Sequence, residues 1–292
     1  MQILSIQSHV VYGHVGNAAV LFPLQRLGHE VWPVPTAILS NHAGYPDFGG
    51  QALAPAVVAE LLQGIERRGA FARCDLMITG YFGLVDTAAA VCDAVAQVRA
   101  ASPELVYCCD PVMGDSGSGL YVDPALPEFF RTHVLPIADI ATPNLFELEL
   151  LRGIEPGRLA TLDADELLAA ARGLIDFMRP DACCLVTSAV HRNIDPENVA
   201  VLAVNRDAAW CVETPNLRFA IEPHGVGDLV SGLFAASMAD HGEMARALEE
   251  SVAIVFAVLS ETQHRGSGEL DLVAARDSIV TPPQQFAARM IV

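Results

Sequence analysis

The segment Gly225-Val226-Gly227-Asp228 could do chemistry, because an acidic residue directly follows two closely spaced glycines. Glycine permits positive φ angles and a close approach of the backbone to a ligand, so successive N–H groups can converge on an anion. The apolar, small-residue run that follows predicts a helix over Asp228–His241, whose positive dipole end would face the same anion. Asp228 could then accept the proton of a hydroxyl group that attacks a phosphate. The alternative is a glycine turn in which Asp228 only caps the helix.

The composition limits the chemistry that the rest of the chain can supply. The 292 residues are 52% hydrophobic and 18% charged, which is typical of one large core, so we expect a single domain over residues 1–292. A net charge of −18 argues against binding to nucleic acid or to an anionic membrane surface. The 17 basic residues are all arginines, and a chain without lysine has neither a lysine Schiff base nor a Walker A loop.

The cysteines indicate packing rather than disulfide or zinc chemistry. Their number is odd and their spacing fits no zinc motif, so we expect reduced, buried thiols. No apolar run reaches membrane-spanning length, and Gln2–Gln7 is too short for a secretory signal, so we expect a cytoplasmic protein. The cysteines are Cys74, Cys92, Cys108, Cys109, Cys183, Cys184 and Cys211. The adjacent pairs lie in predicted strands, where neighbouring side chains point to opposite faces.

Short β-like runs alternate with amphipathic helical segments, and this alternation predicts a mostly parallel sheet covered by helices. The predicted strands are Gln2–Gln7, Glu30–Val34, Leu76–Gly80, Leu105–Asp110, Ile140–Thr142, Cys183–Ser188, Val199–Val204 and Trp210–Glu213. The predicted helices are Asn17–Leu27, Pro55–Arg68, Thr87–Ala101, Asn144–Arg152, Ala164–Met178, Asp228–His241 and Glu243–His264. Ser40–Tyr45 and the Pro- and Gly-rich stretch up to Pro55 predict a loop.

Polar residues follow the early predicted strands, and open parallel sheets bind ligands beyond the carboxyl ends of their strands. Ser8–Asn17 is a glycine-spaced turn that either holds a ring-bearing substrate or caps the first helix through Asn17. Tyr81 either stacks on a substrate ring or packs as a partly buried core aromatic. Neither Ser8–Asn17 nor Gly114–Gly119 has the Gly-x-Gly-x-x-Gly order, so a dinucleotide-binding oxidoreductase is not supported.

Oxygen-bearing side chains follow the later strands. Asp110 ends the fourth strand, where it either holds magnesium or forms a simple Asp-Pro turn. Asn144 and Glu147 have the spacing of a helix capping box, which by itself is a structural feature. These residues and Asp228 would nevertheless meet at one edge of the sheet, and such a group of oxygen ligands suits magnesium that carries nucleotide phosphates.

Several motifs occur in a fixed order along nearly the whole chain. They are Gln7–Gly13 with Gly16-Asn17, Ser40-Asn41-His42, Gly80–Gly83, Asp110–Gly114, Ala138–Ile140 with Thr142–Asn144 and Glu147, and Gly225–Asp228. In this order they resemble the bacterial pyridoxal kinases of the ribokinase-like superfamily. The resemblance implies an α/β, three-layer sandwich with helices on both faces of a mostly parallel sheet. It also implies a homodimer that uses ATP to phosphorylate the 5′-hydroxymethyl group of pyridoxal, giving pyridoxal 5′-phosphate in vitamin B6 salvage, with pyridoxine and pyridoxamine as further substrates.

The resemblance assigns roles to the residues at matching positions. It gives catalysis to Asp228 as the base, with Gly225, Val226 and Gly227. Besides Asp228, the predicted substrate-binding residues are Ser8, Ala43, Gly44 and Tyr81. The predicted ATP-binding residues are Asp110, Thr142, Glu147, Thr187, Ser188, Thr214, Pro215, Asn216 and Leu217. Magnesium is expected at Asp110 and Glu147, and a monovalent cation such as potassium at Thr142 and Thr187, near Asp110.

The chain also departs from the pattern that it resembles. Relatives often have Thr-Gln where this chain has Ala43-Gly44, so a substrate hydrogen bond is expected to be missing or replaced. Some bacterial relatives have lysine within the segment that is Val186-Thr187-Ser188 here. Two alternatives stay open: a hydroxymethylpyrimidine kinase, which also phosphorylates a small heteroaromatic alcohol, and a non-catalytic protein that binds B6 vitamers. The retained carboxylates argue against the second.

Overall fold

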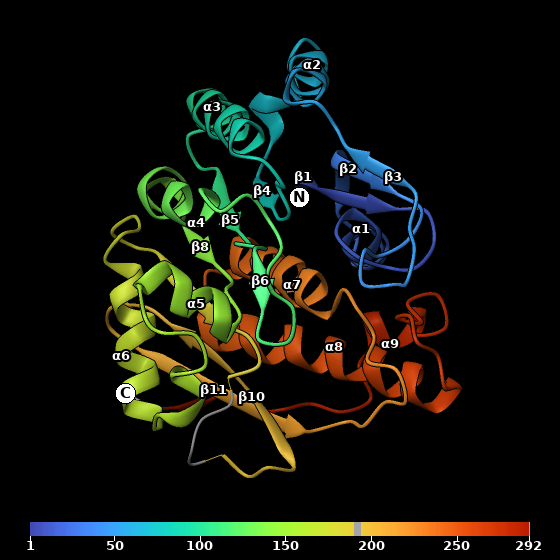
Figure 1. Cartoon of the computed structure of the whole chain (residues 1–292), viewed down its shortest axis with the longest axis vertical. Coiled ribbons are helices and arrows are strands. Elements are labelled where there is room, and N and C mark those ends of the chain that lie inside the picture. The colour runs from blue at the N-terminus through green and yellow to red at the C-terminus, as the bar shows by residue number, and fades with distance from the viewer. Residues whose placement is uncertain (190–193, 292) are drawn as a thin grey trace.

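A ten-stranded sheet runs through the computed structural model, which describes residues 1–189 and 194–291 (Figure 1). Its central strands β2, β1, β4, β5, β8 and β9 pair in parallel, whereas β3, β10, β11 and β12 pair antiparallel at the two edges. The strands in spatial order are β12 (Arg289–Met290), β11 (Ala209–Pro215), β10 (Asn198–Val204), β9 (Cys183–Val186), β8 (Ile140–Ala141), β5 (Val106–Cys109), β4 (Leu76–Thr79), β1 (Gln2–Val10), β2 (Glu30–Leu39) and β3 (Gly50–Ala52).

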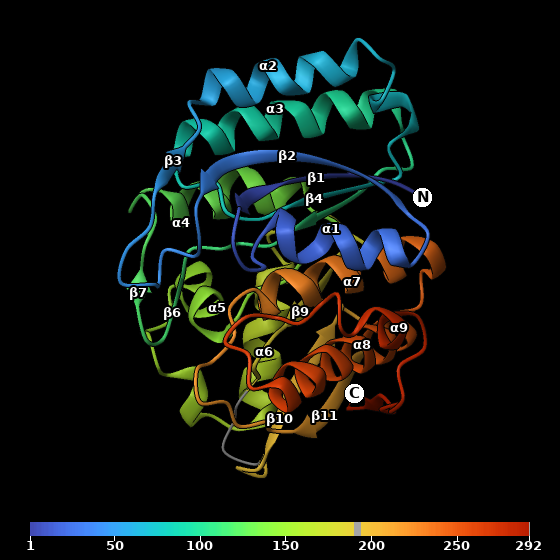
Figure 2. The ribbon, with the colours of Figure 1, turned by 90° about the vertical axis from the view of Figure 1, so that its right-hand side faces the viewer.

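Helices cover both faces of the sheet and give three layers. On one face an apolar cluster contains residues of α2 (Pro55–Glu66), α3 (Val85–Ala101), α4 (Leu126–Phe129), α5 (Leu145–Arg152) and α6 (Ala164–Ile175). On the other face a second cluster contains residues of α1 (Asn17–Arg26), α7 (Val226–His241), α8 (Met244–Arg265) and α9 (Arg276–Val280). Figure 2 shows α2 and α3 on one side of β1, β2 and β4, with α1 on the other. The predicted three-layer α/β architecture is confirmed.

The adjacent cysteines pack as the strand pattern predicts. Cys108 and Cys183 belong to the cluster under α7 and α8, while Cys109 and Cys184 belong to the cluster on the opposite face. All seven cysteines have free thiols. They therefore act as small apolar side chains in a sheet that is buried on both faces.

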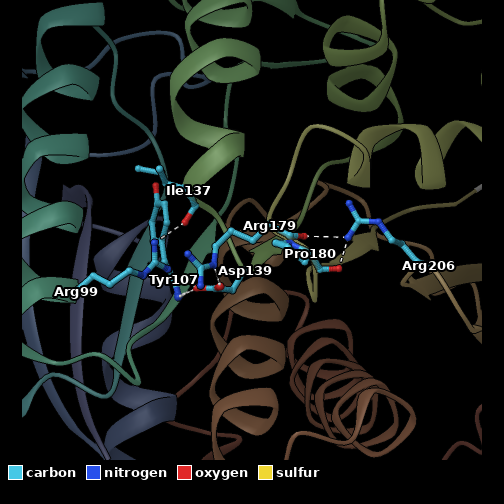
Figure 3. Close-up of polar contacts among 7 residues, drawn as sticks. All are labelled: Arg99, Tyr107, Ile137, Asp139, Arg179, Pro180 and Arg206. Carbon is cyan, nitrogen blue, oxygen red and sulfur yellow. Dashed lines mark hydrogen bonds and ion pairs between the residues drawn. The ribbon is translucent and has the colours of Figure 1, made fainter.

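An ion-pair cluster ties the middle of the sheet to its helices at the start of β8 (Figure 3). Asp139 accepts a hydrogen bond from Arg99 Nη2 of α3 at 2.6 Å and forms an ion pair with Arg179 Nε, which precedes β9, at 2.7 Å. The same carboxylate accepts the backbone N–H of Tyr107 in β5 at 2.8 Å. Because Asp139 is at the amino end of β8, the carboxyl ends of the strands stay free for other residues.

All predicted helices and strands of the sheet are present, but the sequence missed several short elements. The stretch predicted as a loop before Pro55 contains β3, which pairs antiparallel with β2. The glycine-rich segment after Asp110 forms a β-hairpin of β6 (Gly114–Asp115) and β7 (Gly119–Leu120), and α4, α9 and β12 were also missed. The alternative in which Asn17 caps the first helix is wrong. Gly16 is the N-cap residue of α1, and Asn17 Nδ2 instead donates to the carbonyls of Gln7 at 2.9 Å and Val34 at 3.3 Å, which joins β1 to β2.

Candidate active site

A cavity of about 840 Å³ lies where the parallel strands end. Residues from the carboxyl ends of β1, β4, β5, β8 and β9 line it together with the start of α7. Every residue that the sequence analysis assigned to the site lies on its wall: Ser8, Ala43, Gly44, Tyr81, Asp110, Thr142, Glu147, Thr187, Ser188, Thr214, Pro215, Asn216, Leu217, Gly225, Val226, Gly227 and Asp228. The predicted convergence is confirmed, while the role of each residue remains a prediction.

The glycine turn before α7 has the geometry that an anion site needs. Gly225 has φ +85°, and a Cβ atom there would lie 1.8 Å from the carbonyl oxygen of His14, so only glycine fits. Outside the chain neighbours of Gly227 and the backbone of its own helix, no atom lies within 4 Å of its Cβ position, and Gly227 lines the cavity. The first N–H groups of a helix lack helical acceptors, and those of α7 therefore form a positive pole at the cavity wall.

Asp228 lies in the first turn of α7 and is partly exposed to the cavity. Removal from bulk water raises its pKa from 3.8 to about 6, and a hydrogen bond from the backbone of Gly16 limits this rise. A carboxylate with a pKa near 6 is ionised at neutral pH yet is basic enough to take a proton from an alcohol in the transition state. The location and pKa of Asp228 fit a general base.

Two buried carboxylates lie deeper in the cavity. Asp110 is 5% exposed and Glu147 is 3% exposed. Burial, followed by repulsion from Asp228, raises the pKa of Asp110 to about 8, and hydrogen bonds with Ser231 and Thr142 oppose this rise. Burial and repulsion from Asp110 raise the pKa of Glu147 well above its ordinary value. No arginine lines the cavity in the part of the chain that the structure describes, so no guanidinium group offsets the buried negative charge there.

The chemistry of these ligands suits magnesium. Carboxylate oxygens are hard ligands, and magnesium commonly takes one or two protein carboxylates and fills its other positions with water and phosphate oxygens. Within the described residues no three His, Cys, Asp or Glu side chains gather into a metal-binding group. Asp110 and Glu147 would therefore supply a partial set that a nucleotide completes.

Glu147 also has the structural role that its spacing predicts. Its carboxylate accepts the backbone N–H groups of Asn144 and Met113, both at 3.0 Å, and Asn144 Oδ1 accepts the N–H of Glu147 at 2.9 Å. The capping box of α5 is thus confirmed. It fixes the direction of the carboxylate with respect to Asp110.

The residues predicted to bind the substrate ring come from three strand ends. Ser8 lies in β1, Tyr81 follows β4, and Ala43-Gly44 lies in the loop after β2. Tyr45 of that loop donates its hydroxyl group to Glu269 Oε1 at 2.6 Å, and the same glutamate accepts the N–H of His14. The Glu269 carboxylate therefore holds two loops together beside the cavity.

The residues predicted to bind ATP occupy another part of the wall. Thr187 follows β9, and its N–H donates to the carbonyl of Pro143. Ser188 has φ +50° although it is not glycine, a conformation that is rare and often occurs at functional sites. Thr214–Leu217 lies at the end of β11 and in the segment after it, and the N–H of Asn216 donates to the carbonyl of Glu197 at 2.7 Å.

Three further parts of the wall were not predicted from the sequence. The β6–β7 hairpin contributes Asp115 and Ser118, and Tyr121 follows it. His42 stacks on His224 with ring centroids 3.9 Å apart. An apolar portion contains Val199 and Val201 of β10, Phe219, and Val252, Val255, Phe256 and Leu259 of α8. The last four recur with helical spacing, which in a sequence cannot be distinguished from an ordinary core stripe.

The fold and the site together define a class of protein. A three-layer α/β sandwich, a glycine turn at a helix start with an adjacent carboxylate, and oxygen ligands at the strand ends are the features of a ribokinase-like small-molecule kinase.

Among the described residues no helix is both long enough and apolar enough to cross a bilayer.

Comparisons with known proteins identify the family. Residues 50–272 match the family described as phosphomethylpyrimidine kinase. The chain is 43% identical over 298 residues to pyridoxal kinase PdxY of Rubrobacter xylanophilus, with 100% of this chain and 98% of that protein covered. It is 44% identical over 291 residues to pyridoxal kinase PdxY of Deinococcus radiodurans, with 99% and 96% covered. The structure of pyridoxal kinase from Leishmania donovani in complex with ADP and pyridoxamine aligns with a TM-score of 0.88 at 28% identity, covering 100% of this chain and 99% of that chain. The chain belongs to the pyridoxal kinase family.

Proposed function

We propose that this protein is a pyridoxal kinase that transfers the γ-phosphoryl group of ATP to the 5′-hydroxymethyl group of pyridoxal, forming pyridoxal 5′-phosphate and ADP. The observation that carries the proposal is the placement of Asp228 and the Gly225–Asp228 turn at one cavity with Asp110 and Glu147. Full-length similarity to proteins named pyridoxal kinase supports the choice of substrate. Pyridoxine and pyridoxamine carry the same hydroxymethyl group and are further candidate substrates.

In the proposed reaction Asp228 accepts the proton of the substrate's 5′-hydroxyl group. The oxygen of that hydroxyl group forms a bond to the γ-phosphorus of ATP. The bond between that phosphorus and the bridging oxygen of the β-phosphate breaks, and ADP leaves. The backbone N–H groups at the start of α7 donate to the transferring phosphoryl group, where negative charge develops. Because α7 is anchored in the apolar cluster, this donor array is held in place before the substrates arrive.

Asp110 and Glu147 are proposed to hold magnesium together with the ATP phosphates. When bound, the ion would neutralise phosphate charge and orient the nucleotide. Thr142 and Thr187, near Asp110, are proposed to hold a monovalent cation such as potassium. The apolar wall between β10 and α8, with Thr214–Leu217 at its edge, is a suitable surface for the adenine ring.

A homodimer is also proposed. Several large apolar side chains are exposed on β2, on the segments beside it and on α2: Val11, Ile38, Phe48, Val57 and Leu61. Apolar groups gathered on one part of a surface favour association. Light scattering after gel filtration tests this, and Ile38→Glu with Phe48→Glu is expected to shift the protein toward monomers. A native protein that is monomeric at micromolar concentration would refute the dimer.

A cytoplasmic location is proposed as well, because seven free thiols suit a reducing compartment.

The decisive experiment for the function measures ADP release with each candidate alcohol under the same conditions. Pyridoxal should support turnover far better than hydroxymethylpyrimidine. Equal or better turnover of the pyrimidine would favour the hydroxymethylpyrimidine kinase alternative. Saturable binding of pyridoxal without ADP release would favour a non-catalytic binding protein.

A further inference from the structure

Two histidine rings stack face to face on the substrate side of the cavity. The centroids of His42 and His224 are 3.9 Å apart and their planes differ by 25°. His42 lies in the loop after β2, and His224 directly precedes Gly225 of the glycine turn. Both line the cavity. The stack therefore joins the loop beside the predicted ring site to the turn where phosphoryl transfer is proposed.

Gly44 makes the space for this stack. Its φ angle is not in the positive range, so the backbone does not itself require glycine. A Cβ atom on Gly44 would lie 2.9 Å from Nδ1 of His42 and 3.4 Å from Nε2 of His224. The first separation is shorter than side chains tolerate, so the His42 ring would have to shift, and the second is at the limit of an ordinary van der Waals contact. The absence of a side chain at position 44 therefore leaves room for the two imidazole rings.

The hydrogen bonds of the stack leave polar atoms free for a ligand. The N–H of Gly44 donates to Nδ1 of His42 at 3.1 Å, which places the proton of the neutral His42 ring on Nε2. Within residues 1–189 and 194–291 neither ring nitrogen of His224 has a hydrogen-bond partner. His224 can thus donate to a group that enters the cavity.

The charges on the wall indicate what that group is. The acidic residues of the wall are Asp110, Asp115, Glu147, Glu222 and Asp228. Among the described residues that line the cavity, only His42 and His224 can carry a positive charge on the side chain. An anionic or electron-rich oxygen on the acceptor molecule would be repelled by the carboxylates and can be met by these imidazoles.

We propose that His224 is a specificity-determining residue that binds the acidic ring hydroxyl of pyridoxal, and that His42 supports it by stacking. This proposal rests on the proposed function and concerns how the same site recognises its acceptor substrate. The hydroxyl group of a pyridoxal ring ionises readily and accepts a hydrogen bond from an imidazole N–H. Hydroxymethylpyrimidine has an amino group and no ring hydroxyl, so the same imidazole would favour pyridoxal.

The first test compares His224→Val and His224→Gln with the native enzyme in steady-state assays of ADP release. His224→Val should raise the KM for pyridoxal about 10- to 100-fold, the usual effect of losing a hydrogen bond to a charged group. The KM for ATP should change less than about twofold, because the nucleotide does not contact His224 in this proposal. His224→Gln keeps an N–H donor and should recover part of the loss. His264→Val, on the exposed end of α8, is the matched control.

A second arm changes the substrate instead of the protein. Pyridoxal 3-O-methyl ether cannot ionise at the ring oxygen, so the native enzyme should bind it more weakly than pyridoxal. His224→Val should then have little further effect on the KM for the ether. The proposal would be overturned if His224→Val raised the KM for pyridoxal and the KM for the ether by the same factor, or if it changed neither KM.

The contact with Gly44 gives a third arm that does not depend on the substrate analogue. Gly44→Ala places a Cβ against the stacked rings and should raise the KM for pyridoxal. When Gly44→Ala is combined with His224→Val, the KM for pyridoxal should rise by less than the product of the two single increases, because His42 can then move away from the new Cβ atom. Independent effects would show that the rings do not depend on Gly44. If the native enzyme released no ADP with pyridoxal, the proposed function would be refuted. If the native enzyme were active but the His224 variants had an unchanged KM for pyridoxal, only the role of His224 would be refuted.

Discussion

Replacing Asp110 by Asn is expected to stabilise the ligand-free protein while it impairs catalysis. Asp110 is 5% exposed, lies in the field of Asp228 and has a pKa raised to about 8. In the unfolded chain the same carboxyl group ionises near 3.8. The folded state therefore binds a proton more tightly than the unfolded state, so this group lowers the stability of the folded state as the pH rises from about 4 to about 8. Asn has the same shape and no charge to bury.

The size of the effect follows from the shift. A pKa difference from 3.8 to about 8 corresponds to a cost on the order of 5 kcal/mol once Asp110 is fully ionised in the folded protein. The amide of Asn still has to be desolvated, and it loses part of the hydrogen bonding with Ser231 and Thr142. We expect a net gain of about 1 to 3 kcal/mol in the free energy of unfolding above pH 8, which is a rise of a few degrees in Tm. Below pH 4 the gain should vanish, because Asp110 is then protonated in both states.

Denaturant unfolding at several pH values, in EDTA and without nucleotide, measures this gain. Asp277→Asn is the matched control, because the side chain of Asp277 on α9 is 80% exposed and should give no gain with pH. Adding magnesium with ADP should raise the free energy of unfolding of the native protein more than that of the Asp110→Asn variant, because the variant lacks one of the proposed magnesium ligands. A variant less stable than the native protein at pH 8, or a gain independent of pH, would refute the account of Asp110 as an uncompensated buried charge.

Three further predictions concern catalysis. Asp228→Asn should lower kcat by a factor on the order of 100 or more with nucleotide binding retained, since it removes the proposed base; near-native turnover of a folded variant would reduce Asp228 to a helix-start residue. In the native enzyme kcat/KM should fall as the pH drops below about 6, where Asp228 becomes protonated, and a pH series with a pH-insensitive coupling assay measures this. Potassium should activate the enzyme at fixed magnesium and ionic strength, and Thr187→Val should weaken the activation. The assay is a potassium titration in a tetramethylammonium background, and a flat response of the native enzyme would remove the second cation.

The sequence predicts the fold well where the periodicity is long. Each predicted helix and strand exists, because apolar runs in a sheet that is buried on both faces differ clearly from amphipathic helices. The missed elements are short. The pairs Gly114–Asp115 and Gly119–Leu120 contain too few residues to show an alternating pattern, and β12 is defined by its contact with β11 rather than by its own residues.

The positions of the site residues were predictable for a physical reason. In a parallel sheet the residue after each strand lies at the same edge, so Asp110, Thr142 and Thr187 converge whatever their distance along the chain. The stack of His42 on His224 was not predictable in this way. It joins residues from two loops, and the loop after β2 depends on a hydrogen bond between Tyr45 and Glu269, 224 residues apart. No local pattern contains such a contact.

Glu147 shows why a structural and a functional interpretation of one motif need not compete. As the capping-box residue of α5 it accepts two backbone N–H groups, and each of its oxygens uses one of them. A carboxylate oxygen has a second lone pair, so each can still accept from a magnesium-bound water or contact the ion itself. The backbone bonds lower the cost of keeping Glu147 charged beside Asp110, although they do not remove it, since the pKa of Glu147 remains raised. Glu147→Gln would therefore disturb the helix start and the proposed metal site together, whereas Asp110→Asn removes the other proposed metal ligand and leaves the capping box of α5 unchanged, so the difference between the two variants isolates the contribution of the cap.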